Sequence, residues 1–63
     1  MWVARDKSGG ISLFTTKPFK HEDRWEYDFF LGNEVFINKN LFPEVTWEDE
    51  EPTEVKIIID KNE

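Results

Sequence analysis

Residues 2–16 read Trp-Val-Ala-Arg-Asp-Lys-Ser-Gly-Gly-Ile-Ser-Leu-Phe-Thr-Thr, two extended runs on either side of a glycine pair. The first run, residues 2–6, begins with Trp and Val, which favour β-strands. Residues 11–16 resume the same extended pattern. Residues 8–10, Ser-Gly-Gly, suit a tight reversal that requires positive φ. Two such runs around a short glycine-bearing link predict a β-hairpin.

A second hairpin is expected farther along the chain. Residues 25–31 (Trp-Glu-Tyr-Asp-Phe-Phe-Leu) largely alternate apolar and polar side chains, which is typical of a strand with one buried face. Gly-Asn at 32–33 predicts a turn, and residues 34–38 form another short run. Residues 19–24 are polar and have no repeat, so we expect a loop there, after Pro18 has ended the preceding strand.

The rest of the chain contains a corner and one more strand. Residues 39–43 end in Pro43, which is expected to hold the preceding Phe42 in an extended conformation. A single helical turn over residues 39–42 is the alternative. Residues 54–60 alternate again and predict a last strand, whose partner, the first hairpin or the second, the pattern leaves open.

Together these segments predict an all-β fold. No segment shows a helical period longer than about two turns. We therefore expect one small domain over residues 1–63, a small antiparallel meander of about five short strands that forms a curled sheet or open barrel.

Composition narrows the function classes. The chain has no cysteine, which removes disulfides, thiol nucleophiles and zinc–thiolate sites and favours a reducing compartment such as the cytoplasm. It has no apolar run long enough to cross a membrane, and we expect no signal peptide. Its formal net charge of −6 argues against direct binding to nucleic acid. We expect a soluble, acidic, intracellular protein.

The negative charge is concentrated in residues 44–54, which we call the acidic segment. It holds six carboxylates and no basic residue, whereas the acids and bases elsewhere balance. One interpretation is a solvated loop that keeps a small protein soluble. Another is a docking surface for a basic protein partner. A metal site is disfavoured because the segment has neither the alternating oxygen spacing nor the glycine of a calcium loop.

The candidate binding residues are the central part of the acidic segment: Trp47, Glu48, Asp49, Glu50 and Glu51. Trp47 has two interpretations. It is either a core anchor that pins the segment to the sheet or an exposed contact, where a tryptophan flanked by acids would suit a Lys- or Arg-rich partner through cation–π contact.

Catalysis has little support in the sequence. His21 is the only histidine and lies in a polar stretch without a motif that would supply a nucleophile or a second ligand. We expect no enzyme activity, no cofactor and no metal.

Residues 29–30 and 57–59 place apolar side chains on both faces of a strand. Such strands are either buried on both sides or leave an apolar face for self-association. A homodimer is possible, because small domains often gain stability by oligomerisation when their core is small.

Two stretches of the sequence are similar to a known group of proteins. Residues 3–14 (Val-Ala-Arg-Asp-Lys-Ser-Gly-Gly-Ile-Ser-Leu-Phe), followed by Lys-Pro at 17–18, are the first. Residues 41–55 (Leu-Phe-Pro-Glu-Val-Thr-Trp-Glu-Asp-Glu-Glu-Pro-Thr-Glu-Val) are the second. Together they resemble a group of small proteins of unknown function encoded by phages and prophages. The resemblance implies an origin in a mobile element and the cytoplasm of a bacterial host, but no reaction.

The function expected from these observations is that of a non-catalytic protein-interaction module of phage or prophage origin. In this hypothesis the sheet presents Trp47 and the acidic segment to a basic protein. The alternative is an acidic mimic of nucleic acid that inhibits a host DNA- or RNA-binding protein. Mimicry requires carboxylates on a rigid surface, whereas a mobile loop would only confer solubility.

Overall fold

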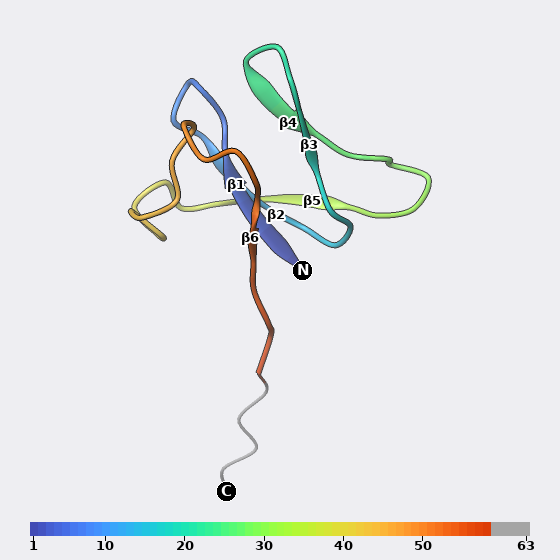
Figure 1. Cartoon of the computed structure of the whole chain (residues 1–63). Helices are drawn as coiled ribbons and strands as arrows, with labels where there is room; N and C mark the ends of the chain where they lie inside the picture. Colours follow the sequence, from blue (N-terminus) through green and yellow to red (C-terminus); the bar gives the residue numbers. More distant parts are fainter. Residues whose placement is uncertain (59–63) are drawn as a thin grey trace, which may run out of the picture.

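The structure, a computed structural model, describes residues 1–58, which form six short strands in two antiparallel sheets and no helix. Figure 1 shows the larger sheet and, beside it, a two-stranded hairpin. The larger sheet has the order β5-β2-β1-β6 and stays open, so the expected all-β fold is confirmed. The strands are β1 (Trp2–Arg5), β2 (Ile11–Phe14), β3 (Phe19–His21), β4 (Arg24–Glu26), β5 (Glu34–Ile37) and β6 (Thr53–Glu54).

The first predicted hairpin is confirmed. β1 and β2 pair antiparallel, with Val3 opposite Leu13 and Arg5 opposite Ile11. Gly9 has a φ of 102°, the left-handed region that glycine enters without strain, and its N–H donates to the Asp6 carbonyl at 2.9 Å. The glycine pair therefore closes the reversal as the sequence indicated.

The predicted second hairpin is wrong. Residues 19–24, expected to be a loop, contain β3 and the start of β4, which pair with each other. Residues 25–31 were expected to be one strand, but the strand ends at Glu26. Asp28 explains the end: its side chain accepts the Phe30 N–H at 3.0 Å, and its carbonyl accepts the N–H groups of Leu31 and Gly32. This local turn takes the hydrogen bonds that a continued strand would have offered to a neighbour.

β5 consequently pairs with β2 instead of β4. Thr15 continues the ladder, because its N–H donates to the Asn33 carbonyl at 3.1 Å and its hydroxyl accepts the Asn33 N–H at 2.8 Å. Figure 1 shows the connection from β4 to β5 swinging away from both sheets. Phe29, Phe30 and Leu31 in this connection are exposed, so residues 29–30 are not part of a strand buried on both faces.

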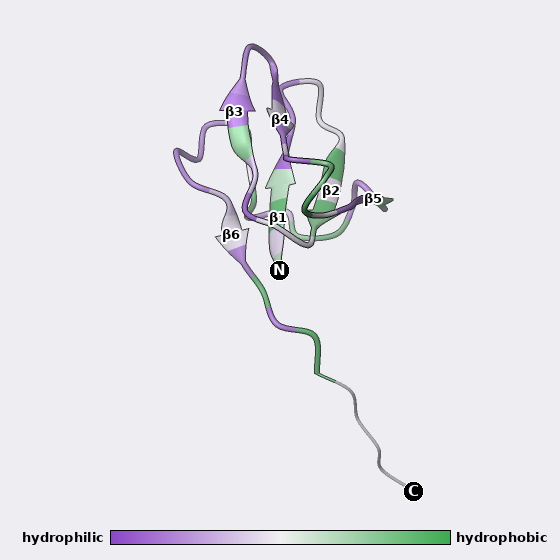
Figure 2. Ribbon diagram, turned by 90° about the vertical axis from the view of Figure 1, so that its right-hand side faces the viewer, coloured by the Kyte–Doolittle hydropathy of each residue, from purple (hydrophilic) through white to green (hydrophobic). Residues whose placement is uncertain are grey.

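The expected last strand is much shorter than residues 54–60. β6 covers only Thr53 and Glu54 and pairs with β1, which belongs to the first hairpin. Figure 2 shows the chain leaving the sheet after β6. Ile57 and Ile58 are exposed, and the remainder of the predicted strand, from Ile59 onward, lies outside the described residues.

Both faces of the larger sheet carry a core cluster because alternating side chains of β1 and β2 point to opposite faces. We call them the valine cluster, formed by Val3, Ile11 and Val45, and the tryptophan cluster, formed by Ala4, Phe14 and Trp25. Leu13, Ile37, Phe42 and Val55 extend the first, and Tyr27 and Trp47 extend the second. The predicted curled sheet is therefore covered on each side, by residues 42–45 and by the β3–β4 hairpin.

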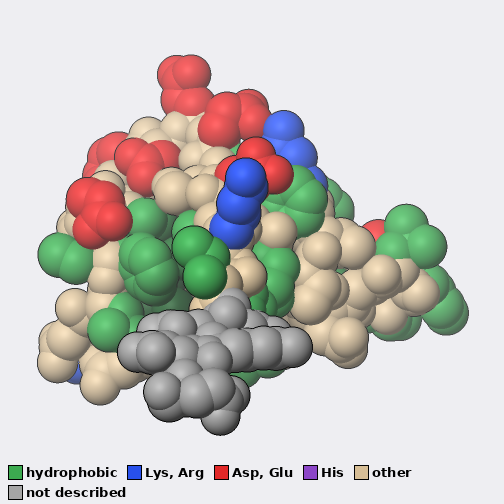
Figure 3. All heavy atoms as spheres, turned by 90° about the horizontal axis from the view of Figure 1, so that it is seen from below, with side chains coloured by type: hydrophobic (Ala, Val, Ile, Leu, Met, Phe, Trp, Pro, Cys, Tyr) green, Lys and Arg blue, Asp and Glu red, His purple; other side chains and the backbone are tan. Residues whose placement is uncertain are grey.

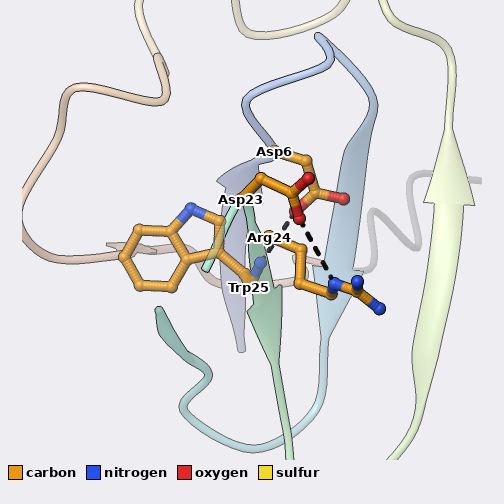
Figure 4. A network of polar contacts seen from close by, with 4 residues as sticks. All are labelled: Asp6, Asp23, Arg24 and Trp25. Carbon is orange, nitrogen blue, oxygen red and sulfur yellow. Dashed lines mark hydrogen bonds and ion pairs between the residues drawn. The ribbon is translucent and has the colours of Figure 1, made fainter. Parts of the chain in front are cut away.

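Asp6 holds the β3–β4 hairpin against the larger sheet, as Figure 4 shows. Its carboxylate accepts the Trp25 N–H at 2.8 Å, and the Trp25 indole N–H donates to the Arg5 carbonyl at 3.0 Å. The Lys7 N–H donates to the Asp23 carbonyl at 3.1 Å. Three hydrogen bonds thus join the end of β1 to the start of β4 and seat the Trp25 ring in its cluster.

The corner at residues 39–43 is a turn and contains no helix. The Leu41 N–H donates to the Asn38 carbonyl at 2.9 Å, and the Val45 N–H donates to the Phe42 carbonyl at 2.9 Å. The expectation of an extended Phe42 is wrong, because its φ is 54°. A bulky residue in this left-handed region is strained and persists only where surrounding contacts fix it.

No helix among residues 1–58 has the length and apolar character needed to cross a bilayer.

Gly32 is expected to tolerate no side chain. A Cβ there would lie 2.6 Å from the Thr16 hydroxyl oxygen and 2.7 Å from that of Thr15. Because Thr15 is committed to the β2–β5 ladder, Gly32→Ala should lower the free energy of unfolding by about 2 kcal/mol. Urea unfolding followed by tryptophan fluorescence measures this loss.

The matched control is Gly10→Ala. A Cβ at Gly10 meets only the Ser8 hydroxyl oxygen, at 3.9 Å, so this change should stay within about 0.5 kcal/mol of the parent. Equal losses at the two glycines would contradict the close approach of the β4–β5 connection to the end of β2.

Candidate functional site

The acidic segment is anchored to the sheet at both sides of its first turn. Val45 is 2% exposed and belongs to the valine cluster on one face of the sheet. Trp47, two residues later, is half-buried and packs against the tryptophan cluster on the other face. Residues 45–47 therefore pass from one core cluster to the other, which fixes the backbone that leads into the carboxylates.

Arg5 holds the chain that precedes the acidic segment. Its guanidinium donates to the carbonyls of Val45 at 2.7 Å, Gly9 at 2.8 Å, Leu41 at 3.1 Å, Lys39 at 3.2 Å and Phe42 at 3.2 Å. The rigid fork of a guanidinium can serve several acceptors that a lysine ammonium would not reach together. These bonds keep Phe42 in its strained conformation.

Sequence reasoning missed Arg5. One signal was present: alternation along β1 places position 5 on the same face as Val3, opposite Ile11. A charged residue at an inward-facing position requires polar partners. The pattern gives no clue that those partners are carbonyls of residues 39–45.

Trp47 belongs to an aromatic pair. Its ring and that of Trp25 meet edge to face, with centroids 6.4 Å apart and planes at 79°. Such geometry is favourable for aromatic side chains and adds to the area that they bury. Of the two interpretations left open for Trp47, this packing supports the core anchor.

In the alternative interpretation Trp47 would receive a cation from a partner, but the chain itself supplies one. Lys20 reaches over from β3 and places its ammonium 4.3 Å from the Trp47 ring centroid and 5.5 Å from that of Trp25. The same ammonium donates to the Trp47 carbonyl at 2.6 Å. Lys20, also missed from sequence, thus ties the β3–β4 hairpin to the acidic segment.

Two of the four predicted carboxylates have polar partners in the chain, and two are exposed without an ion-pair partner among residues 1–58. Asp49 closes a turn, because its two carboxylate oxygens accept the Thr46 N–H at 3.1 Å and the Thr46 hydroxyl at 3.2 Å. Glu51 forms an exposed ion pair with Lys17 at 3.0 Å. Glu48 and Glu50 are exposed and have no ion-pair partner within residues 1–58.

A shallow groove of about 360 Å³ lies between β3 and the acidic segment. Its walls carry charges of both signs, from Lys17 and Lys20 on one side and from Glu50 and Glu51 on the other, with apolar surface from Phe19 and Trp25 between them. The groove is open to solvent and its opposing charges lie close together, so it offers a small mixed surface instead of an enclosed ligand site.

His21 is exposed at the end of β3. The part of the chain that the structure describes holds no group of three or more His, Cys, Asp or Glu residues placed to bind a metal ion.

Trp47→Ala is expected to lower the free energy of unfolding by about 2 kcal/mol, less than the 3–5 kcal/mol typical of a fully buried aromatic, because the ring is only half-buried. Trp47→Phe keeps an aromatic face for Lys20 and should cost about half as much. Urea unfolding monitored by far-ultraviolet circular dichroism measures both. A loss below about 0.5 kcal/mol for Trp47→Ala would contradict the anchor interpretation.

Comparisons with protein-family models, with curated proteins and with solved structures gave no match to this chain. The resemblance to small phage and prophage proteins therefore stays a prediction, and the site is interpreted from its own geometry.

Proposed function

We propose that this protein is a non-catalytic interaction module that docks to a basic protein through the exposed carboxylates of its acidic segment. Glu48 and Glu50 are the contact residues, with Asp49 and Glu51 shaping the surface and Trp47 anchoring it. The supporting observation is the anchored backbone of a segment whose carboxylates at 48 and 50 remain exposed and without an ion-pair partner among the described residues.

Anchoring favours docking over a purely solubilising role. A surface whose backbone is already fixed loses less conformational entropy when it binds. The contacts of Val45, Trp47 and Asp49 fix this backbone before any partner arrives. A loop that served only solubility would need none of them.

The charge distribution supports a basic partner. Figure 3 shows most of the acidic side chains in view gathered along one side of the molecule, next to hydrophobic ones and with a few basic side chains beside them. A patch with an excess of one sign raises the rate of encounter with an oppositely charged surface and sets the orientation of docking. Cation–π recognition by Trp47 is not part of the proposal, since Lys20 occupies that ring.

The test compares two charge variants that each remove two negative charges. Glu48→Gln with Glu50→Gln alters the proposed contact, and Glu22→Gln with Glu26→Gln is the matched control outside the acidic segment. Each protein is used to capture partners from a bacterial lysate at about 50 mM and about 500 mM salt. A basic protein identified in this way is then titrated against all three proteins.

We expect the Glu48/Glu50 variant to bind that protein about tenfold more weakly at low salt, and the control to bind like the parent. Binding by the parent should fall at high salt, where exposed charges are screened. Equal weakening by both variants would assign the effect to net charge alone. Unchanged binding by the Glu48/Glu50 variant would overturn the proposal.

The nucleic-acid mimic remains the second candidate, because mimicry also requires an anchored backbone. Competition separates the two. If duplex DNA displaces the captured protein, the acidic segment occupies a phosphate-binding surface, and if DNA and this protein bind together, the docking surface lies elsewhere on the partner. The phage origin and bacterial cytoplasm belong to the proposal and rest on the sequence resemblance.

A further inference from the structure

β5 is an edge strand with apolar side chains on both of its faces. It pairs with β2 on one side, and no strand among the described residues pairs with its other side. Val35 is 54% exposed and Phe36 is 77% exposed. Figure 2 shows β5 at the periphery of the molecule.

The outward hydrogen-bonding groups of β5 can be assigned. Thr15 and Asn33 form a hydrogen-bonded pair, since the Thr15 N–H donates to the Asn33 carbonyl. Hydrogen-bonded and non-hydrogen-bonded pairs alternate along an antiparallel ladder. With Phe14 opposite Glu34 and Ser12 opposite Phe36, the N–H and C=O groups of Glu34 and Phe36 therefore point away from β2, toward the open edge.

The other open edges carry the features that prevent strand addition. β6 has two residues and lies between Pro52 and Lys56, and β3 follows Pro18 and contains Lys20. β4 has three residues, begins with Arg24, and its Trp25 N–H is already bound by the Asp6 carboxylate. Short length, proline and lysine are the usual protection of edge strands. β5 has four residues, no lysine and no proline, with a single charge at its first position.

We propose that a second copy of this chain binds this edge, so that the two β5 strands pair antiparallel about a two-fold axis at Phe36. The four-stranded sheets of the two copies then form one continuous sheet of eight strands. Phe36 exchanges N–H···O=C hydrogen bonds with the partner's Phe36. Val35 lies opposite the partner's Ile37 on one face, and Glu34 lies opposite the partner's Asn38.

Pairing about Phe36 gives partners to the free backbone groups of β5 and also keeps like charges apart. Centring the axis on Glu34 would oppose two carboxylates, whereas centring it on Phe36 opposes two aromatic rings. The acidic segment runs into β6, at the opposite edge of the sheet from β5. The β5 interface therefore keeps the strongest negative charges of the two copies apart, and it leaves the proposed docking surface free.

The apolar surface near β5 is large enough to contribute to a stable dimer. Phe29, Phe30 and Leu31 lie in the connection that leads into β5 and are all exposed. Figure 3 shows hydrophobic side chains at the end of this projecting connection. With an aromatic side chain burying about 150–250 Å², these residues and Phe36 offer roughly 600 Å² per copy, near the roughly 800 Å² of a standard interface.

Sedimentation equilibrium of the full chain over a range of concentrations tests the proposal. We expect the parent to approach twice its monomer mass of 7.6 kDa. Phe36→Lys places a charge at the two-fold axis and should weaken dimerisation at least tenfold. Ile58→Lys is the matched control, because Ile58 is 85% exposed but follows β6, at the opposite edge of the sheet from β5. Circular dichroism checks that both variants remain folded.

The register has its own test, because the chain contains no cysteine. Phe36→Cys places two thiols on a hydrogen-bonded pair with Cα atoms about 5.5 Å apart, within disulfide range. Val35→Cys places them about 8 Å apart, outside that range. Under air oxidation Phe36→Cys should crosslink at least tenfold faster than Val35→Cys.

Three results would overturn the proposal: a parent that stays monomeric up to about 1 mM, a dimer that Phe36→Lys leaves intact, or equal weakening by Phe36→Lys and Ile58→Lys. Crosslinking at equal rates from positions 35 and 36 would overturn the register. None of these results bears on the acidic segment, so the dimer and the docking proposal fail or stand separately.

Discussion

Arg5→Ala is expected to lower the free energy of unfolding by about 3 kcal/mol. Three of the carbonyls that accept from the guanidinium, those of Gly9, Phe42 and Val45, are partly buried. Those of Gly9 and Val45 would lose their side-chain donor, and that of Phe42 would keep only the Val45 N–H. The strained φ of Phe42 would lose its main support. A small domain has roughly 3–5 kcal/mol in total, so the variant should keep no more than about 2 kcal/mol and begin to unfold at much lower urea concentrations than the parent. Urea unfolding followed by tryptophan fluorescence measures the loss.

Two controls keep this prediction interpretable. Arg5→Lys retains the charge and most of the aliphatic stem but cannot serve several carbonyls together, and it should lose about 2 kcal/mol. Lys7→Ala removes an exposed cation two residues away and should stay within about 0.5 kcal/mol of the parent. If Arg5→Lys unfolds at the same urea concentration as the parent, the guanidinium geometry is unimportant and only its charge matters.

Trp25→Ala is expected to have the largest effect in the chain, about 4 kcal/mol. Trp25 is 4% exposed, packs with Ala4 and Phe14, and supports the ring of Trp47. Its removal would leave a cavity between the β3–β4 hairpin and the larger sheet. We expect an unfolded protein at 25 °C, recognised by the loss of its strand signal in far-ultraviolet circular dichroism.

Trp25→Phe separates packing from hydrogen bonding. It keeps an aromatic ring but removes the indole N–H that donates to the Arg5 carbonyl, and should lower the free energy of unfolding by about 1–2 kcal/mol. Together with the half-buried Trp47, these variants should give the order Trp25→Ala, Trp47→Ala, Trp25→Phe from the largest loss to the smallest. A Trp47→Ala loss as large as that of Trp25→Ala would contradict the assignment of Trp25 as the central anchor.

Part of the fold follows from local patterns. The hairpin of β1 and β2 was predictable because alternation on both sides of Gly9 and Gly10 is a short-range signal. β5 was predictable within one residue for the same reason. The β3–β4 hairpin was not, because all three residues of β3 are exposed and the turn at Glu22 and Asp23 lacks the glycine or asparagine that usually marks it. Glu22 adopts a φ of 59° without that signal.

The location of the candidate site in the chain could be predicted, but the role of each of its residues could not. The acidic segment is evident from charge alone. The roles within it come from contacts: Asp49 with Thr46, Glu51 with Lys17, and the Trp47 ring with Lys20. These contacts separate Glu48 and Glu50 from carboxylates that already have partners. Composition treats all four carboxylates alike.

The sequence by itself determined β1, β2 and β5, the tight turn at Gly9 and the position of the negative charge, because each depends on residues close together in the chain. Only the tertiary structure decided that β5 pairs with β2, that Arg5 binds carbonyls 34–40 residues away, and that Lys20 covers Trp47. A periodic pattern specifies which face of a strand is apolar but not which strand or carbonyl will meet it. That choice depends on how all the segments pack at once, so it is settled only when the chain folds.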